Sequence, residues 1–225
     1  MPRLTSKNKT KTIQKKTPAG TNTRNLLVFG AVGLIVLAII VFTLTRPQPQ
    51  SLNAARLGSD PGYGPASAKV TIIEYGDFGC TTCRAWEKAG VLKQILAVYG
   101  DKIHFVWKDL PIITSASPKA AEAGQCSFDQ DKFWEYHDLL YAKAPALSSA
   151  DLKAYAAQLG LDQTRFNTCL DSSQDAAKVT QSTNEGHQYG FNATPAFLVN
   201  GQKLLGPPSF ETLKALIDPL LNAGS

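Results

Sequence analysis

Hydrophobic positions are distributed along this chain in two different ways. Residues 26–44, LLVFGAVGLIVLAIIVFTL, form an almost entirely apolar run without a charge or a polar face. At about 1.5 Å per helical residue the run is about 28 Å long, close to the ~30 Å hydrocarbon core of a bilayer. From residue 68 onward, apolar residues recur in short strand-like runs and at helical spacing. The pattern therefore predicts a transmembrane anchor at residues 26–45 and a folded domain at residues 68–222.

A cleaved secretory signal is the alternative to an anchor. Such a signal has a shorter apolar region, followed by small residues at the cleavage site. The residues that follow here, TLTRPQPQ, lack that pattern. We therefore expect the apolar run to be a retained anchor.

The elements expected within the domain define its fold class. Their order is strand, helix, strand, a long helical block, a hairpin with a tight Asn-Gly turn, and a last helix beginning after a serine cap. This order predicts an α/β fold, a small mixed sheet flanked by helices, with an inserted all-helical subdomain. The corresponding residues are 69–75, 83–100, 102–110, about 117–190, 195–206 and 209–222.

Charge is distributed unevenly, and this sets the expected topology. The first 25 residues carry seven basic residues and no acidic one, whereas the chain from Arg46 onward carries 16 basic and 18 acidic residues. The positive-inside rule makes residues 1–25 a basic cytoplasmic tail, and residues 46–67, rich in Pro and Gly, are predicted to be a linker. The domain is then expected on the extracytoplasmic side of the cell membrane, in a single-pass protein, where disulfides persist. Its slightly negative charge argues against nucleic-acid binding.

Cys80 and Cys83 form a C-x-x-C motif, CTTC, between a predicted strand and a predicted helix. As a crosslink the pair would stabilise little, because it closes a loop of four residues. As a metal site it lacks partners, because neither the other two cysteines nor the three histidines lie at ligand spacing. At a helix N-terminus, however, the helix dipole and free N–H groups stabilise a thiolate. A redox centre is therefore the favoured interpretation, with crosslink and metal site as alternatives.

Two further residues bear on this interpretation. Glu74 lies in the first strand, six residues before Cys80, among apolar residues. It is either an outward-pointing acid or a buried acid with a raised pKa that moves protons for the cysteine pair. Pro195 follows Thr194 at a strand entrance, where a trans proline is ordinary and a cis proline would present the backbone of Thr194 to a substrate peptide.

The segments VTIIEYGDFGCTTC, FVWKDLP, DKFWEYHDLLY, FNTCLDS and YGFNATPAFLVNG together resemble the DsbA family of thiol–disulfide oxidoreductases. The resemblance covers about residues 60–222 and implies a thioredoxin fold with an inserted helical domain. It implies Cys80 as the exposed attacking cysteine and Cys83 as the resolving one. It also implies Glu74 as the buried acid and Pro195 as a cis-proline preceded by Thr194.

The sequence departs from the best-known members of that family between its two cysteines. The dipeptide is Thr81-Thr82, without the histidine that helps the strongest oxidants destabilise their own disulfide. The two hydroxyl groups could still donate hydrogen bonds to a Cys80 thiolate. Asp77 and Phe78, just before the motif, are expected to shape the rim of the active site together with Thr81 and Thr82.

The other two cysteines, Cys126 and Cys169, fall on separate predicted helices of the helical block. In an oxidising compartment two remaining cysteines most simply pair with each other, and the loop that they close gives a model stabilisation of ~4 kcal/mol. We therefore expect a structural disulfide, with an electron relay to Cys80 as the alternative and pairing with a partner protein as a third. His137 and His187 are interpreted as surface or capping residues, and His104 as either a core or a functional residue.

Taken with the resemblance, these features predict a membrane-anchored thiol–disulfide oxidoreductase that oxidises reduced, newly exported proteins. The resemblance implies reoxidation by a membrane partner of the DsbB or VKOR type. No bound cofactor or metal is expected, because the cysteine pair carries the electrons, and without an obvious dimerisation module we expect a monomer. The alternatives are a reductase or isomerase acting on misfolded clients, and a redox-inert anchored chaperone or adaptor.

Overall fold

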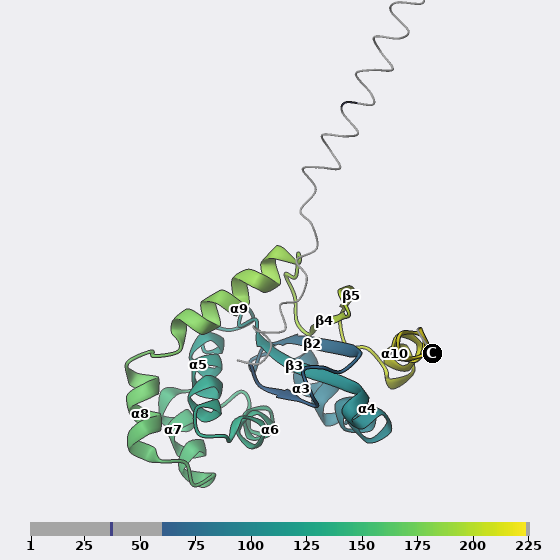
Figure 1. Ribbon diagram of the computed structural model, residues 1–225. Coiled ribbons are helices and arrows are strands. Elements are labelled where there is room, and N and C mark those ends of the chain that lie inside the picture. Colours follow the sequence, from purple (N-terminus) through teal and green to yellow (C-terminus); the bar gives the residue numbers. More distant parts are fainter. Residues whose placement is uncertain (1–36, 38–59, 224–225) are drawn as a thin grey trace, which may run out of the picture. The chain divides into compact units, whose positions relative to one another are not determined.

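The computed structural model describes residue 37 and residues 60–223, and Figure 1 shows a mixed sheet flanked by helices. The predicted tail at 1–25 and the predicted anchor at 26–45, apart from Leu37, lie outside the described residues. Within the described part of the chain, no helix has both the length and the apolar character needed to cross a membrane.

Five strands form the sheet in the order β1-β3-β2-β4-β5. β2 and β3 are parallel, and the other neighbouring pairs are antiparallel. The central strands are buried along nearly their whole length, as expected for runs rich in β-branched and aromatic residues. The strands are β1 (Gly62–Tyr63), β2 (Val70–Gly76), β3 (Ile103–Asp109), β4 (Ala196–Val199) and β5 (Gln202–Leu205).

The edge strand β1 lies within the range predicted to be a linker. Gly62 and Tyr63 pair with Val106 and Phe105 of β3, and the buried Lys108 forms an ion pair with Asp60 at 2.7 Å. The sheet therefore begins before residue 68, the predicted start of the domain. Two residues without a hydrophobic pattern give no strand signal of their own, and their pairing depends on β3.

The helical segment expected at residues 83–100 is two helices, α3 (Thr81–Lys88) and α4 (Val91–Tyr99). Gly90 separates them with φ of 68°, a left-handed conformation that glycine adopts at little cost. The single-helix prediction was wrong here, because the apolar spacing continues on both sides of the break. A short 3₁₀ helix, η1 (Gly100–Lys102), then leads into β3.

The helical insertion predicted at about 117–190 is confirmed. In Figure 1, α5 to α8 gather beside the sheet on the side away from α4 and α10, and α9 returns the chain to β4. Their shared core contains Tyr136, Leu140 and Phe166, all fully buried. The helices are α5 (Ser117–Phe128), α6 (Phe133–Lys143), α7 (Ser149–Gln158), α8 (Gln163–Asp171) and α9 (Ala176–Gln188).

The C-terminal hairpin and helix follow their local sequence signals. Asn200 and Gly201 form the β4–β5 turn with φ of 44° and 87°, both in the left-handed region that this dipeptide tolerates. Ser209 caps α10 (Phe210–Asn222), because its side chain accepts a hydrogen bond from the N–H of Thr212 at 3.1 Å. Both predictions are confirmed.

Candidate active site

Cys80 and Cys83 lie where the central sheet meets the first turn of α3. Cys80 is the N-cap of this helix, and its Sγ accepts a hydrogen bond from the N–H of Cys83 at 3.2 Å. Both cysteines are free thiols in this structure. The resemblance implied an exposed Cys80, yet only 4% of this residue is exposed, against 1% of Cys83. Cys80, the candidate for the reactive cysteine, is thus almost completely buried by the residues around it.

The two sulfurs differ strongly in acidity. The pKa of Cys80 is lowered to about 6, chiefly by its hydrogen bond with Cys83, with further help from Thr194 and from the N–H groups of the helix start, against the opposing effect of burial. The pKa of Cys83 is raised, first by burial and then by its hydrogen bond with Cys80 and the charge of Glu74. At neutral pH the pair therefore holds its negative charge on Cys80.

The loop before β4 closes over the pair from the other side. The Thr194-Pro195 peptide bond is cis, and Cys80 Sγ donates to the Thr194 carbonyl oxygen at 3.3 Å. The Thr194 hydroxyl is buried and has no hydrogen-bond partner within residues 60–223. The Thr194 carbonyl thus contacts Cys80 across a separation of 114 residues, and the side chain of Thr194 lowers the pKa of both cysteines.

Glu74 lies inside the sheet, beneath the cysteine pair. Only 3% of it is exposed, and its neighbours in register are Trp107 on β3 and Phe197 on β4. Burial raises the pKa of Glu74 well above its usual value, and the charges of Glu87 and Cys80 raise it further. Of the two interpretations of Glu74, the structure therefore supports the buried acid.

The expected rim residues divide into two groups. Thr81 and Thr82 are exposed, whereas Phe78 is buried and stacks on Trp107, with ring centroids 5.1 Å apart. Phe78 therefore supports the active-site loop from below instead of forming an exposed rim. The Trp107 indole fits here because Gly76, the last residue of β2, has no side chain. A Cβ atom at Gly76 would lie 2.1 Å from the Trp107 ring.

Asp77, expected with Phe78 to shape the rim around Cys80, holds the active-site loop in shape. Its two carboxylate oxygens accept hydrogen bonds from the N–H groups of Gly79 at 2.7 Å and Ile113 at 2.8 Å. The Tyr141 hydroxyl donates to the Asp77 carbonyl at 3.3 Å. The sequence signal for this role is an acid that directly follows a buried strand and lies two residues before a glycine, because Asp side chains in turns commonly accept a hydrogen bond from the backbone N–H two residues on.

His137 was predicted at the surface, and this prediction was wrong. The residue is 2% exposed and packs against the rings of Trp107, Tyr141 and Phe78, with centroids 4.9, 4.9 and 5.6 Å away. It lies on α6, where the aromatic residues at helical spacing mark the face that is buried. The other two histidines are separate from this cluster: His104 is buried in β3, and His187 is exposed with its Nδ1 3.1 Å from the Phe191 carbonyl.

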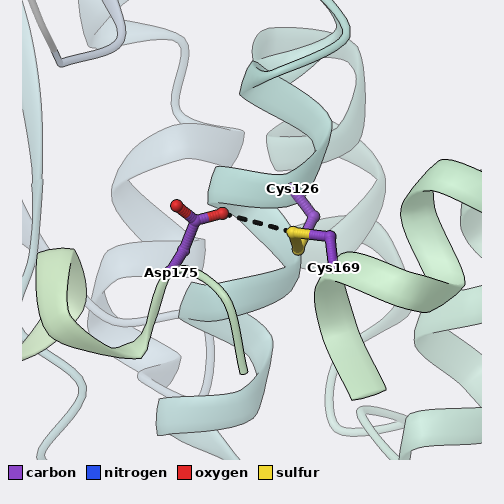
Figure 2. A group of neighbouring side chains, drawn as sticks. All are labelled: Cys126, Cys169 and Asp175. Carbon is purple, nitrogen blue, oxygen red and sulfur yellow. Dashed lines mark hydrogen bonds between the residues drawn. A yellow bond between two sulfur atoms is a disulfide. The ribbon is translucent and has the colours of Figure 1, made fainter. Parts of the chain in front are cut away.

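Cys126 and Cys169 form a disulfide that joins α5 to α8, as expected (Figure 2). Their Cα atoms are 5.9 Å apart. Figure 2 also shows Asp175 beside this bond, with a carboxyl oxygen 3.2 Å from Cys169 Sγ. Because a disulfide sulfur carries no hydrogen, a hydrogen bond here requires the carboxyl group to donate, and burial accordingly raises the pKa of Asp175. These three side chains lie close enough to hold a metal ion, but the sulfurs are bonded to each other and offer no thiolate.

Comparison with solved structures shows which fold this arrangement belongs to. BdbD from Bacillus subtilis, in its oxidised form, superposes with a TM-score of 0.68 and 21% identity over 74% of this chain and 95% of that one. The thiol-disulfide exchange protein α-DsbA2 from Wolbachia pipientis gives a TM-score of 0.64 and 22% identity over 72% and 87%. The fold is therefore that of the DsbA-type thiol–disulfide oxidoreductases.

Curated relatives are closer in sequence but much longer. The Na⁺/H⁺ antiporter NhaA 3 of Salinispora tropica is 33% identical over 210 residues, which are 85% of this chain and 32% of that protein. The NhaA antiporter of Herminiimonas arsenicoxydans is 34% identical over 155 residues, 69% of this chain and 24% of that protein. This chain thus spans about a third or less of the relatives' length. The family model described as thioredoxin matches residues 57–219, well over half of the chain. The chain therefore belongs to the thioredoxin family.

Proposed function

We propose that the protein is an extracytoplasmic thiol–disulfide oxidoreductase that oxidises exported proteins through Cys80 and Cys83. The observation that carries this proposal is the division of acidity within the pair. Cys80 has a pKa lowered to about 6 at the start of a helix, and Cys83 has a raised pKa in the core. One sulfur is thereby suited to be attacked and to leave, and the other to keep its proton.

The exchange that this geometry supports has two steps. In the oxidised protein a client thiolate attacks Cys80 Sγ, a client–Cys80 disulfide forms, and the Cys80–Cys83 bond breaks. The electron pair stays on Cys83, whose sulfur then takes up a proton. A second client thiolate attacks the client sulfur of the mixed disulfide and releases Cys80 as a thiolate. The client loses two electrons, and the protein gains them as the dithiol seen in this structure.

Two groups assist this exchange without being attacked. Glu74, buried next to the pair and with a raised pKa, supplies and accepts the proton of Cys83. The Thr194 hydroxyl favours the Cys80 thiolate by lowering the pKa of Cys80. The Thr194 backbone carbonyl, 3.3 Å from Cys80 Sγ, lies where an incoming client strand would pair. Thr81 and Thr82 are exposed next to Cys80 and form the rim that a client meets first.

The direction of electron flow follows from which form of the pair is favoured. Each interaction that stabilises the Cys80 thiolate favours the dithiol over the disulfide, and so favours passing the disulfide on. This is the argument for an oxidase. A reductase or an isomerase of the same fold is the alternative, and a redox-inert anchored chaperone or adaptor is a more distant one.

The proposed location and partners depend on the sequence. The uncharged apolar run at 26–44 and the basic residues before it support a single-pass anchor with the catalytic domain outside the cytoplasm. Reduced or misfolded exported proteins would be the clients of a monomer, and a membrane reoxidant of the DsbB or VKOR type would restore the disulfide. The antiport activity named for the curated relatives is not included, because this chain spans about a third or less of their length.

The test is the reduction potential of the Cys80–Cys83 pair, measured on the full-length chain equilibrated in glutathione buffers. A value near or above the ~−180 mV of protein disulfide isomerase supports the oxidase, and one near or below the ~−270 mV of thioredoxin contradicts it and favours a reductase. Cys80→Ser is the control that separates this pair from Cys126–Cys169. If the pair never equilibrates with glutathione, the result would contradict both redox functions and favour the redox-inert chaperone or adaptor.

A further inference from the structure

A groove of about 820 Å³ begins beside the cysteine pair, between α3 and α6. Its α3 side includes Thr81, Arg84 and Lys88, and its α6 side includes Asp138 and Tyr141. Thr81 directly follows Cys80, so one end of the groove adjoins the sulfur at which exchange is proposed to occur. The exchange steps themselves use none of the groove's charged residues.

The dimensions of the groove suit a short piece of extended chain. Thr81, Arg84 and Lys88 lie on one face of α3, because helical residues three, four or seven apart point the same way. The eight residues from Thr81 to Lys88 span seven helical steps, a rise of about 10 Å, which is the length of about three residues of extended polypeptide. A client whose cysteine is at Cys80 could therefore place its next few residues along this face.

The charges in the groove are not balanced. Lys93 Nζ lies 3.8 Å from Glu87 and 3.9 Å from Asp138, so one lysine is shared by both carboxylates that line the groove. Arg84 and Lys88 form no ion pair within the described residues. Arg84 Nη1 instead donates to the Ala144 carbonyl at 2.6 Å, which fixes the guanidinium at the groove wall.

A favourable interaction with the dipole of α3 would explain only one of these two cations. Lys88 is in the last turn of α3, where a cation interacts favourably with the helix dipole. Arg84 is in the first half of the helix, where the dipole does not favour a cation. The chain from Arg46 onward has more acidic than basic residues, whereas Arg84 and Lys88, one helical turn apart and without carboxylate partners in the described residues, give this groove a local excess of positive charge.

We propose that this groove is a docking subsite for an acidic stretch of client polypeptide next to the client cysteine that exchanges with Cys80. Arg84 and Lys88 supply the attraction, and the groove supplies room for about three residues. This proposal rests on the proposed function, because it names the clients that the exchange site prefers. Charges of this kind act mainly on the rate of encounter and on the choice of partner.

The test uses three dithiol peptides that differ only in the three residues beside one cysteine, which are acidic, neutral or basic. Oxidation by the full-length, oxidised chain is followed as kcat/KM at low and high salt. We expect the acidic peptide to be oxidised about three- to tenfold faster than the basic one at low salt, and this ratio to shrink as salt screens the charges. Lys88→Glu should abolish or reverse the ratio, and the milder Lys88→Gln and Arg84→Gln should reduce it.

Lys102→Glu is the matched control. Lys102 is an exposed lysine without a carboxylate partner in the described part of the chain, and it precedes β3 at the end of the sheet opposite the cysteines. Its charge reversal should leave the acidic-to-basic ratio at the wild-type value. A ratio that is the same in wild type, Lys88→Glu and Lys102→Glu would overturn the proposal.

A binding measurement separates this proposal from the exchange function. The same peptides with serine in place of cysteine, carrying a fluorescent label, report docking by anisotropy without any exchange. If no cysteine peptide is oxidised although the acidic serine peptide binds in a Lys88-dependent way, the exchange function fails and the groove remains. If all cysteine peptides are oxidised equally and none of the serine peptides binds selectively, the groove proposal fails and the exchange function remains.

Discussion

The two cysteine pairs of this chain have the same side chains in opposite surroundings. Cys80 and Cys83 are three positions apart at the start of a helix, as free thiols facing the cis-proline loop. Cys126 and Cys169 are 43 positions apart on two different helices and are bonded to each other. An acid lies near each pair, the buried Glu74 near the first and the partly buried Asp175 near the second.

The difference shows how placement decides what a cysteine pair does. A disulfide between close positions constrains the unfolded chain little, whereas one across 43 positions constrains it strongly. The helix N-terminus stabilises a thiolate on Cys80, whereas Cys126 and Cys169 lie in the last turns of their helices, α5 and α8. The first pair therefore gains reactivity from its position, and the second gains stability.

The largest expected effect separates the pairs by activity. Cys80→Ser should reduce dithiol peptide oxidation on the order of a thousandfold or more, because it removes the sulfur that is attacked. The double variant Cys126→Ala/Cys169→Ala should keep most of that activity at a temperature where it is folded. Stopped-flow oxidation of a fluorescent dithiol peptide measures both. Equal losses in the two variants would contradict the comparison and support an electron relay between the pairs.

The second prediction concerns stability, to which we expect the Cys126–Cys169 disulfide to contribute most. Cys126→Ala/Cys169→Ala should lower the free energy of unfolding by ~4 kcal/mol, the value expected for closing a loop of this length. Reducing only Cys80–Cys83 in the wild-type chain should change it far less. Denaturant unfolding followed by circular dichroism compares the two. An unchanged midpoint in the double variant would show that the second disulfide does not stabilise the fold.

How far the sequence could predict these surroundings depends on the range of the interactions. The Asn200-Gly201 turn, the Ser209 cap and the position of Cys80 at a helix start depend on neighbouring residues and were predictable. The helix break at Gly90 was missed, because the hydrophobic spacing runs through it and only its positive φ shows the interruption. Although the break depends only on Gly90 and its neighbours, many glycines lie inside unbroken helices, so a glycine alone does not predict a break.

Long-range packing was harder to predict from the residues themselves. The burial of His137 depends on rings from β3 and the active-site loop that meet α6 only in the folded domain. The approach of Thr194 to Cys80 spans 114 residues, and a family resemblance indicated it where residue patterns left it open. Pairing of Cys126 with Cys169 was predictable by elimination, whereas the carboxyl group of Asp175 beside it was not.

The third prediction tests the acid near the reactive pair. Glu74→Gln should slow the formation of the mixed disulfide about ten- to hundredfold, because glutamine cannot supply the proton that Cys83 takes up when the Cys80–Cys83 bond breaks. The second step, in which Cys80 leaves as a thiolate, should change much less. Trapping the mixed disulfide by acid quench and following its formation and its decay measures the two steps separately. A formation rate equal to that of the wild type would mean that Glu74 is buried without moving protons.

The fourth prediction concerns the acidity of Cys80. With a pKa of about 6, Cys80 is about nine-tenths thiolate at pH 7 and about one-tenth at pH 5, so its alkylation by iodoacetamide should fall about tenfold between them. An unperturbed cysteine would lose about a hundredfold over the same interval. Thr194→Val should move the midpoint of this profile upward, because it removes a hydroxyl group that stabilises the thiolate. Mass spectrometry of the alkylated full-length chain distinguishes Cys80 from Cys83.

The smallest expected effect comes from Asp175, the acid near the second pair. Burial raises the pKa of Asp175 above its unfolded value of 3.8, so its contribution to stability is fully present below about pH 3.8 and is lost as the pH rises through the raised pKa. Asp175→Asn should remove this loss, while giving up the favourable charge at the start of α9. The two effects oppose each other, so the net change at pH 7 should stay below ~1 kcal/mol.

The informative quantity for Asp175 is therefore the change with pH. From about pH 4 to pH 7 the wild-type chain should lose stability relative to Asp175→Asn, whereas the rate of dithiol peptide oxidation should be the same in both. Urea unfolding at several pH values, paired with the oxidation assay, gives both readouts. An oxidation rate that falls with Asp175→Asn would show that the second pair affects the exchange at Cys80, and the division between a reactive pair and a structural pair would then be wrong.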